Sequence, residues 1–231
     1  MNEFERYGIR ADAEICLKVK KYCSLLEYWN SRFDLTSVAP ELYMEKHILD
    51  SVLPMQIPGA LPDAGKAIDV GSGAGLPGLM LALFLPRVEW TLMDAQRKRC
   101  NFLNLCVEEL AVRNVRVVQM RAEEAGRSPD YREKYDFAAA RAVSRLSVLT
   151  EYMLPLLKPQ GRMLCWKGPS YTEELGAGAG AAQILGGKET AVYKVPYLND
   201  RYLIRYDKTE PTAEKYPRRN GIPNKHPLAE E

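Results

Sequence analysis

The fold of this chain is decided by Ala67-Ile68-Asp69-Val70-Gly71-Ser72-Gly73-Ala74-Gly75-Leu76-Pro77-Gly78. A short apolar run ends at an acid, glycines follow at every second position, and an apolar helical pattern begins after them. This order predicts a strand, a tight turn and a helix. Glycine removes the side chains that would keep a nucleotide-like ligand away from the backbone, and it allows positive φ. We expect the helix to direct its first N–H groups at whatever lies over the loop.

Strand-like runs and helical patterns alternate after this stretch. Strands are predicted at 66–71, 88–94, 115–120, 135–141, 161–167, 189–195 and 201–207. Helices are predicted at 76–85, 96–111, 145–157 and 171–185, with a weaker one at 122–131. Because strands that alternate with helices form parallel βαβ units, we expect an α/β fold whose seven-stranded sheet is mostly parallel and covered by helices on both faces. The last two strands are joined by a turn without a helix, which predicts one antiparallel strand.

The first sixty residues have a different pattern. Apolar residues recur every three or four positions from Ala11 to Trp29, which is typical of an amphipathic helix, and a shorter helix is expected from Pro40 to Val52. Residues 54–66 are rich in proline, glycine and alanine, as linkers are. We therefore expect a helical extension at 1–60 that packs on a main domain at 61–231, the two forming one structural unit.

The composition disfavours several classes of protein. The longest apolar window, Leu76 to Pro86, is interrupted by glycine and proline, so no membrane span is expected. The first residues are charged and are not expected to form a signal peptide. Five cysteines without a C-x-x-C pair are typical of reduced thiols in a cytoplasm, and they disfavour a metal site or a disulfide framework. We expect a cytoplasmic protein, monomeric and without a metal.

Acidic residues lie where predicted strands end. Asp69 precedes the glycines, Asp94 closes the second strand, and Ala122 and Glu123 follow the third. In an open parallel sheet, ligands bind outside the carboxyl ends of the strands. A carboxylate at Asp94 is suited to accept hydrogen bonds from both hydroxyls of a ribose, and Ala122 with Glu123 would flank an adenine.

Two cofactors compete for such a loop. Residues 73–78 fit G-x-G-x-x-G, and with the acid at Asp94 they match the fingerprint of an NAD-binding oxidoreductase. Against NAD, Asp69 would repel a pyrophosphate, and no Y-x-x-x-K pair for hydride chemistry is present. The same carboxylate is placed to attract the cationic end of S-adenosylmethionine. A methyl donor is therefore favoured over NAD.

Several further blocks of the chain occur in an order that resembles a known family. Beside Asp69–Gly78, with Pro77 in the first helical turn, the blocks are Trp29-Asn30, Leu35–Val38, His47–Ser51, Lys98-Arg99, Phe102-Leu103, Arg121–Glu124, Ala140–Val143, Glu151–Lys158, Lys167-Gly168, Tyr216–Pro223 and Pro227-Leu228. Over nearly the whole chain they resemble the bacterial small-subunit ribosomal RNA guanine-N7 methyltransferase family, called RsmG or GidB. Asp34 and Ala95 depart from its pattern, where the family often has Asn and Ser.

This resemblance implies a Rossmann-like, class I methyltransferase that transfers a methyl group from S-adenosylmethionine to N7 of a guanine in 16S ribosomal RNA, alone or in the small subunit. It implies cofactor contacts that agree with and extend those expected from the residues. The expected cofactor-binding residues are Asp69, Gly71, Gly73, Leu76, Asp94, Ala122, Glu123 and Arg141. No single general base is expected, because guanine N7 carries a free lone pair and needs no deprotonation.

The candidate RNA contacts are cationic. Residues 208–226 carry five basic and two acidic side chains, with prolines and a tyrosine among them. The expected contacts are Arg145, Lys167, Lys215, Arg218, Arg219 and Lys225. The alternative for this tail is that it closes the edge of the sheet. For the whole chain, the alternatives to the methyltransferase are the NAD-binding oxidoreductase, a non-catalytic RNA-binding assembly factor with the same fold, and a methyltransferase of proteins or small molecules.

Overall fold

The structure, a computed structural model, describes residues 3–230. Its centre is a sheet with strand order β3-β2-β1-β4-β5-β7-β6. The strands are β1 (Gly65–Val70), β2 (Val88–Asp94), β3 (Val115–Gln119), β4 (Tyr135–Arg141), β5 (Leu157–Lys167), β6 (Gly187–Lys194) and β7 (Tyr202–Lys208). Strand β7 pairs antiparallel with β5 and β6, and the other pairs are parallel. The predicted seven-stranded sheet with one antiparallel strand is confirmed for this part of the chain.

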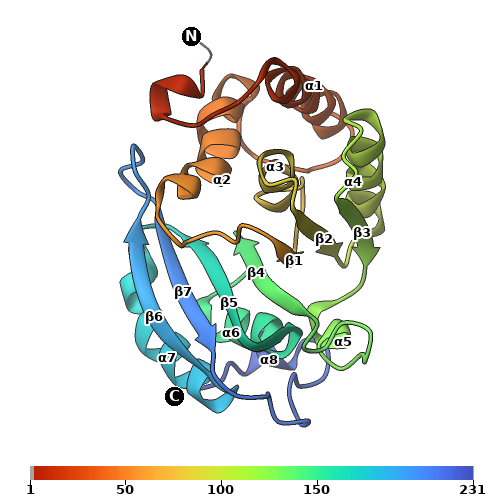
Figure 1. The fold of residues 1–231 in the computed structure, drawn as a ribbon. Helices are drawn as coiled ribbons and strands as arrows, with labels where there is room; N and C mark the ends of the chain where they lie inside the picture. The colour runs from red at the N-terminus through yellow and green to blue at the C-terminus, as the bar shows by residue number, and fades with distance from the viewer. Residues whose placement is uncertain (1–2, 231) are drawn as a thin grey trace.

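Helices cover both faces of the sheet (Figure 1). They are α3 (Gly78–Phe84), α4 (Arg97–Glu109), α5 (Ala122–Ala125), α6 (Leu146–Met153), α7 (Leu175–Ile184) and α8 (Ile222–Lys225). Three predicted helices are too long. The weak helix at 122–131 is a single turn, α5, the helix at 171–185 begins only at Leu175, and the helix at 145–157 ends at Met153. Pro155 follows in a 3-10 turn, because proline lacks the N–H that would continue an α-helix, and β5 begins directly afterwards.

Alternate side chains of the strands build two hydrophobic cores. Trp90 and Leu92 of β2 point into the core shared with α3 and α4, whereas Met93 points into the core shared with α6 and α7. The first core also contains Val19 and Leu26 of the N-terminal extension. Figure 1 accordingly shows α1 (Ala13–Asn30) and α2 (Asp50–Val52) on the same face as α3 and α4, with α6 and α7 on the other.

The N-terminal extension is helical but irregular. Helix α1 (Ala13–Asn30) begins with Asp12, whose side chain accepts from Ile15 N at 2.8 Å. The single helix predicted at 40–52 is instead a 3-10 turn (Pro40–Leu42), a π-helical segment (Met44–Leu49) and the short α2 (Asp50–Val52). π-Helical segments are frequent at functional sites. The extension touches the glycine loop through Tyr22, whose hydroxyl donates to Ala74 O at 2.8 Å.

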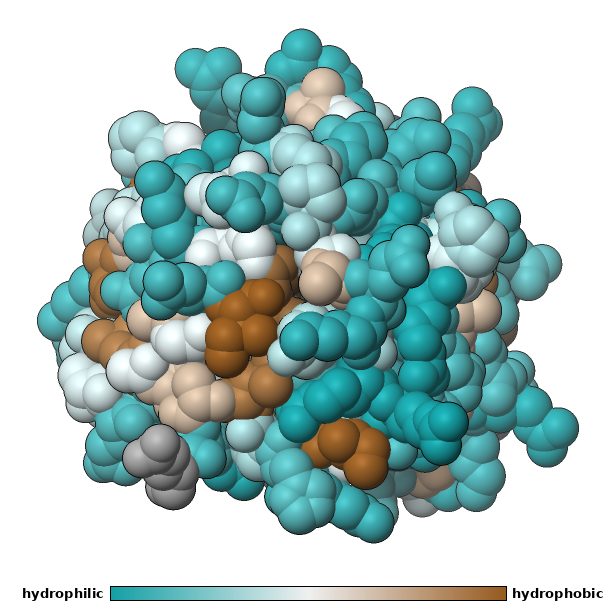
Figure 2. Space-filling model, turned by 90° about the horizontal axis from the view of Figure 1, so that it is seen from below, coloured by the Kyte–Doolittle hydropathy of each residue, from teal (hydrophilic) through white to brown (hydrophobic). Residues whose placement is uncertain are grey.

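The C-terminal segment, residues 209–230, crosses the lower side of the molecule in Figure 1. Arg132 binds this segment to the rest of the fold. Its Nη1 donates to Tyr216 O and, outside the segment, to Gly126 O, each at 2.7 Å, and its Nη2 donates to Thr212 O. The surface seen from this side is mostly hydrophilic, with hydrophobic residues at the left and centre of the view and a smaller separate spot below and to the right of centre (Figure 2). No helix in residues 3–230 is long and apolar enough to cross a membrane.

Candidate functional site

The backbone N–H groups of the glycine loop donate hydrogen bonds to other groups of the protein. Gly71 N and Ser72 N donate to Met93 O at 2.8 and 3.0 Å. Gly73 N donates to Asp94 at 2.9 Å and Gly78 N to Asp69 at 3.0 Å. The expectation that the helix directs its first N–H groups at a ligand is therefore wrong for Gly78, because the carboxylate of Asp69 accepts that hydrogen.

Gly71 is a position where the turn requires glycine. Its φ is +72°, and a Cβ there would lie 2.6 Å from Cγ2 of Val143. A side chain at this position would strain the backbone and collide with the loop after β4. The bare backbone brings the end of β1 close to Val143, and both residues line one cavity.

This first cavity, of about 250 Å³, opens at the carboxyl ends of β1, β2 and β4. Four of the predicted cofactor residues line it: Gly71, Asp94, Ala122 and Glu123. The side chain of Asp94 is buried, and its two oxygens accept from Gly73 N and Gln96 N at 2.9 and 2.8 Å. Each carboxylate oxygen has a second lone pair, so Asp94 retains acceptor capacity for a pair of hydroxyls.

A second cavity, of about 360 Å³, lies between the glycine loop and the N-terminal extension. Gly71, Arg99 and Ala142 line both cavities. The predicted residues Gly73, Leu76 and Arg141 line the second cavity rather than the first. The structure thus divides the predicted cofactor set between two adjoining spaces.

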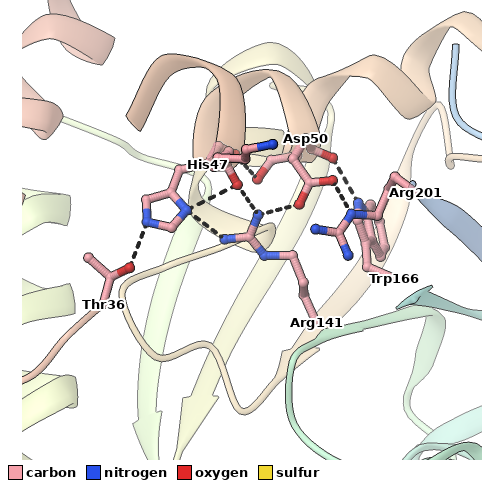
Figure 3. A network of polar contacts seen from close by, with 8 residues as sticks. Thr36, His47, Asp50, Arg141, Trp166 and Arg201 are labelled. Atoms are coloured by element: carbon pink, nitrogen blue, oxygen red, sulfur yellow. Dashed lines mark hydrogen bonds and ion pairs between the residues drawn. The ribbon is translucent and has the colours of Figure 1, made fainter. Parts of the chain in front are cut away.

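One buried carboxylate, that of Asp50, binds two arginines that line the second cavity (Figure 3). Asp50, 2% exposed, accepts from Arg141 Nη1 and from Arg201 Nε, each at 2.6 Å. Its backbone carbonyl accepts from Trp166 Nε1 at 2.9 Å. Buried charges are tolerated when they are paired and hydrogen-bonded, and here one carboxylate serves two guanidinium groups. Arg141 and Arg201 both line the cavity.

His47 lies beside this cluster, also on the cavity wall. Its Nε2 is 2.8 Å from Thr36 Oγ1, and its Nδ1 is 3.3 Å from Nη2 of Arg141. Burial first, and the charge of Arg141 second, lower the pKa of His47 to about 4. The imidazole is therefore neutral at pH 7.

Asp69 lies beneath the loop and lines neither cavity. Its side chain is fully buried, with Oδ2 accepting from Gly78 N and Oδ1 without a hydrogen-bond partner. Burial raises the pKa of this carboxyl group to about 7. Asp69 therefore holds the loop through Gly78 N, and its contact with a cofactor stays a prediction.

The predicted RNA contacts divide into paired and exposed side chains. Arg218 donates to both oxygens of Glu151, at 2.9 and 2.6 Å, and Lys167 pairs with Glu174 at 2.5 Å. Arg145 pairs with Glu230. The other three expected contacts are exposed, and they are Lys215, Arg219 and Lys225.

The sequence did not point individually to Asp50 or Arg201, nor to Thr36 and His47 as parts of a cavity. Asp50 is separated by 91 residues from Arg141 and by 151 from Arg201, so no local pattern connects them. The sequence did indicate these positions in one way, because Thr36, His47 and Asp50 fall within blocks that resemble the family. Residues 3–230 contain no group of three or more His, Cys, Asp or Glu side chains placed to hold a metal ion.

The strand order, the antiparallel β7 and the cavity at the carboxyl ends define the Rossmann-like methyltransferase fold. Solved structures agree: a SAM-dependent methyltransferase from Aquifex aeolicus aligns with a TM-score of 0.54 at 18% identity, covering 70% of this chain and 92% of that one. The YcgJ protein from Bacillus subtilis aligns with a TM-score of 0.52 at 17% identity, covering 68% and 98%. At these identities the likeness concerns the fold alone.

The sequence comparisons identify the family. The family model GidB, described as rRNA small subunit methyltransferase G, matches residues 15–202. The Ribosomal RNA small subunit methyltransferase G of Lactobacillus delbrueckii subsp. bulgaricus is 43% identical, with 90% of each chain covered. The protein of the same name from Lactococcus lactis subsp. lactis is 39% identical, covering 99% of this chain and 97% of that one. The chain belongs to the GidB family of small-subunit ribosomal RNA methyltransferases.

Proposed function

We propose that this protein transfers the methyl group of S-adenosylmethionine to N7 of a guanine in 16S ribosomal RNA, in the cytoplasm. Membership of the GidB family supports ribosomal RNA as the substrate. The choice of guanine N7 rests on the resemblance of the motif blocks and on the chemistry of the site.

The observation that carries the proposal is the position of Asp94 at the base of the first cavity. Its carboxylate has two backbone donors and free acceptor capacity towards the cavity, as a pair of ribose hydroxyls requires. Ala122 and Glu123 lie on the wall of the same cavity, where they would flank the adenine. Gly73 and Leu76 lie on the side of the second cavity, towards which the methionine part would extend.

The residues present suit a reaction that needs alignment rather than proton transfer. When bound, S-adenosylmethionine supplies an activated methyl group on a sulfonium, so the new bond to N7 forms as the carbon–sulfur bond breaks and no proton moves. The protein has to hold the lone pair of N7 in line with that group at near-attack distance. A neutral His47 adds no charge to a wall that already carries the guanidinium groups of Arg141 and Arg201.

The loop geometry weakens the NAD alternative. A pyrophosphate needs backbone N–H groups directed at it, as in the dinucleotide-binding fingerprint. Here the amides of Gly71, Ser72, Gly73 and Gly78 already donate within the protein. The buried Asp69 adds a carboxylate beneath the loop, where an anionic ligand gains nothing from it.

The test is transfer of labelled methyl from S-adenosylmethionine to small ribosomal subunits and to naked 16S RNA that lack N7-methylguanine. Borohydride and aniline treatment would then cleave the RNA at the product. We expect labelled RNA and strand scission at one guanine. Label without scission would reject N7, and no label on either substrate would reject the proposal.

A pair of variants connects that activity to the first cavity. Asp94→Ala removes the proposed ribose contact, and we expect it to abolish measurable transfer. Asp136→Ala is the matched control, because Asp136 also accepts from a backbone amide, Lys66 N at 2.8 Å, but does not line the cavity. Full activity in Asp94→Ala would contradict the assignment of the cofactor site.

A further inference from the structure

We infer that the second cavity is the binding site for the acceptor nucleotide of the RNA, and that Arg201 contacts this nucleotide; the inference rests on the proposed function. The cationic residues on the cavity wall are Lys46, Arg99, Arg141 and Arg201. Among the described residues that line it, none is acidic. Lys46 pairs with Glu45 and Arg99 with Asp94, whereas Arg141 and Arg201 share the single charge of Asp50, so the wall keeps a net positive charge. Such a wall favours an anionic or acceptor-rich ligand, and a nucleotide is both.

The cations at the far end of the cavity lie away from the cofactor side. Arg99 and Gly71 line the first and second cavities, so they face the boundary between the two spaces. Lys46 and Arg201 do not line the first cavity, and instead they line a third one, of about 230 Å³. A ligand that meets Lys46 and Arg201 therefore occupies space beyond the cofactor, where an acceptor would lie.

The network around Asp50 fixes the donors on this wall. Asp50 holds Nε of Arg201 and Nη1 of Arg141, each at 2.6 Å. No described protein atom accepts from the terminal Nη nitrogens of Arg201, and 29% of that side chain is exposed. Arginine only donates, and its planar fork matches the acceptors of a guanine edge or a phosphate. Asp50 is thus a positioning residue, and Arg201 is the contact.

A neighbouring aromatic ring extends the site. Tyr197, 66% exposed, lines the third cavity together with Lys46 and Arg201, and the acidic residues Glu45, Asp50 and Asp200 line it too. These acids disfavour a phosphate in the third cavity, so it suits the uncharged face of a base. Exposed aromatic rings stack on unpaired bases, and single-stranded RNA is bound by such stacking combined with cationic contacts. The three cavities, joined in pairs by shared lining residues, form a path from Asp94 to Tyr197. A target guanine in the second cavity places its neighbour along the strand in the third.

Arg201→Gln tests the contact, with Arg205→Gln as the matched control. Arg205 lies on the same strand, β7, and pairs with Asp207 at 2.7 and 3.1 Å, but it lines none of these cavities. For Arg201→Gln we expect the KM for small ribosomal subunits to rise about tenfold, as the loss of one charged hydrogen bond implies. The affinity for S-adenosylhomocysteine by calorimetry should stay unchanged. The thermal unfolding midpoint should fall, because Asp50 loses one of its two guanidinium partners, so KM is measured at a temperature at which both proteins are folded. Arg205→Gln should leave KM unchanged.

A crosslinking experiment on the wild-type protein avoids any effect of a variant on folding. 16S RNA transcribed with 6-thioguanosine is bound to the protein with S-adenosylhomocysteine and irradiated, and the crosslinked peptides are identified by mass spectrometry. We expect crosslinks within 35–47 and 197–201. Crosslinks found only elsewhere, such as at 215–225, would overturn the inference, as would an unchanged KM in Arg201→Gln.

The two experiments separate this inference from the proposed function. Methyl transfer without crosslinks at the cavity rejects the acceptor site and leaves the function standing. Crosslinks at the cavity without methyl transfer support a nucleotide site in a protein whose proposed activity has failed. If the RNA neither crosslinks to the protein nor becomes methylated, both are wrong.

Discussion

Asp50 and Glu151 are buried carboxylates that hold opposite ends of the chain. Asp50, in the N-terminal extension, is 2% exposed and binds Arg141 and Arg201. Glu151, on α6, is 0% exposed and binds the side chain and the backbone N of Arg218 in the C-terminal segment. In both clusters the partners are distant in sequence, so each pair joins segments that the chain order separates.

The difference between the clusters lies in what their arginines face. Arg141 and Arg201 line the second cavity, whereas neither Glu151 nor Arg218 lines any of the three cavities described above. Strong buried pairing is therefore no sign of a binding site in itself. A buried ion pair is part of a binding site when some of its hydrogen-bond donors remain free and point into a cavity that a ligand can enter.

The largest effect is expected for Asp50→Ala. This change leaves two guanidinium groups without their carboxylate in a buried place, and removing one partner of a buried ion pair costs about 3–5 kcal/mol. We expect urea unfolding to show a loss of that size. Glu151→Ala should cost less, because it releases a single arginine whose side chain is 25% exposed and can be hydrated. Equal losses in the two variants would remove the distinction between the clusters.

The parts of the fold that the sequence predicted depend on local patterns. The alternation of apolar residues placed β2 and β4 correctly to the residue, and the glycine-rich motif placed the turn between β1 and α3. The glycine-rich run 176–180 lies in α7, within the helix predicted at 171–185. These features are decided within about ten residues of chain.

The unpredicted parts depend on contacts across the fold. The Asp50 cluster joins residues from the extension, β4, β5 and the segment before β7. The pairing of Arg218 with Glu151 was equally hidden, because a basic tail looks the same in the sequence whether its arginines face solvent or a buried acid. Composition gave the charge of the tail, and only the packing showed which cation is used within the protein.

The dependence of the free energy of unfolding on pH compares the same two regions, because one of the two histidines, His47, lies beside the Asp50 cluster and the other, His226, lies in the C-terminal segment. Burial lowers the pKa of His47 from 6.5 to about 4. Below pH 6.5 the unfolded chain binds a proton at this residue that the folded chain does not, so stability is lost as pH falls towards 4. We expect His47→Gln to remove up to about 3 kcal/mol of that loss at pH 4, and to have little effect on pH dependence above 7.

His226→Gln is the control for this titration, because His226 is an exposed residue of the C-terminal segment. Asp69 contributes with the opposite sign: its pKa is raised from 3.8 to about 7, so its stabilisation is lost as pH rises through that window. We therefore compare the difference in the free energy of unfolding between each variant and wild type at each pH. The contribution of Asp69 is the same in both proteins and cancels in this difference. A His226→Gln difference as large as that of His47→Gln would show that burial on the cavity side is not the cause.

The smallest effects are expected in the tail, where Arg218→Ala and Arg219→Ala separate two roles of adjacent arginines. Arg218→Ala leaves Glu151 with the backbone N of residue 218 as a donor at 2.8 Å, so we expect a loss of about 2 kcal/mol in urea unfolding. Arg219 is exposed, and Arg219→Ala should leave stability unchanged. If the tail contacts RNA phosphates, Arg219→Ala lowers the salt slope of RNA binding by about one.

These two measurements decide between the two interpretations of the tail. A changed salt slope in Arg219→Ala, with stability intact, assigns RNA contact to the exposed cations and leaves Arg218 as the residue that fastens the segment. An unchanged slope in both variants would mean that the tail only closes the edge of the fold. RNA binding would then depend on the cations of the second cavity, and the C-terminal segment would have a structural role alone.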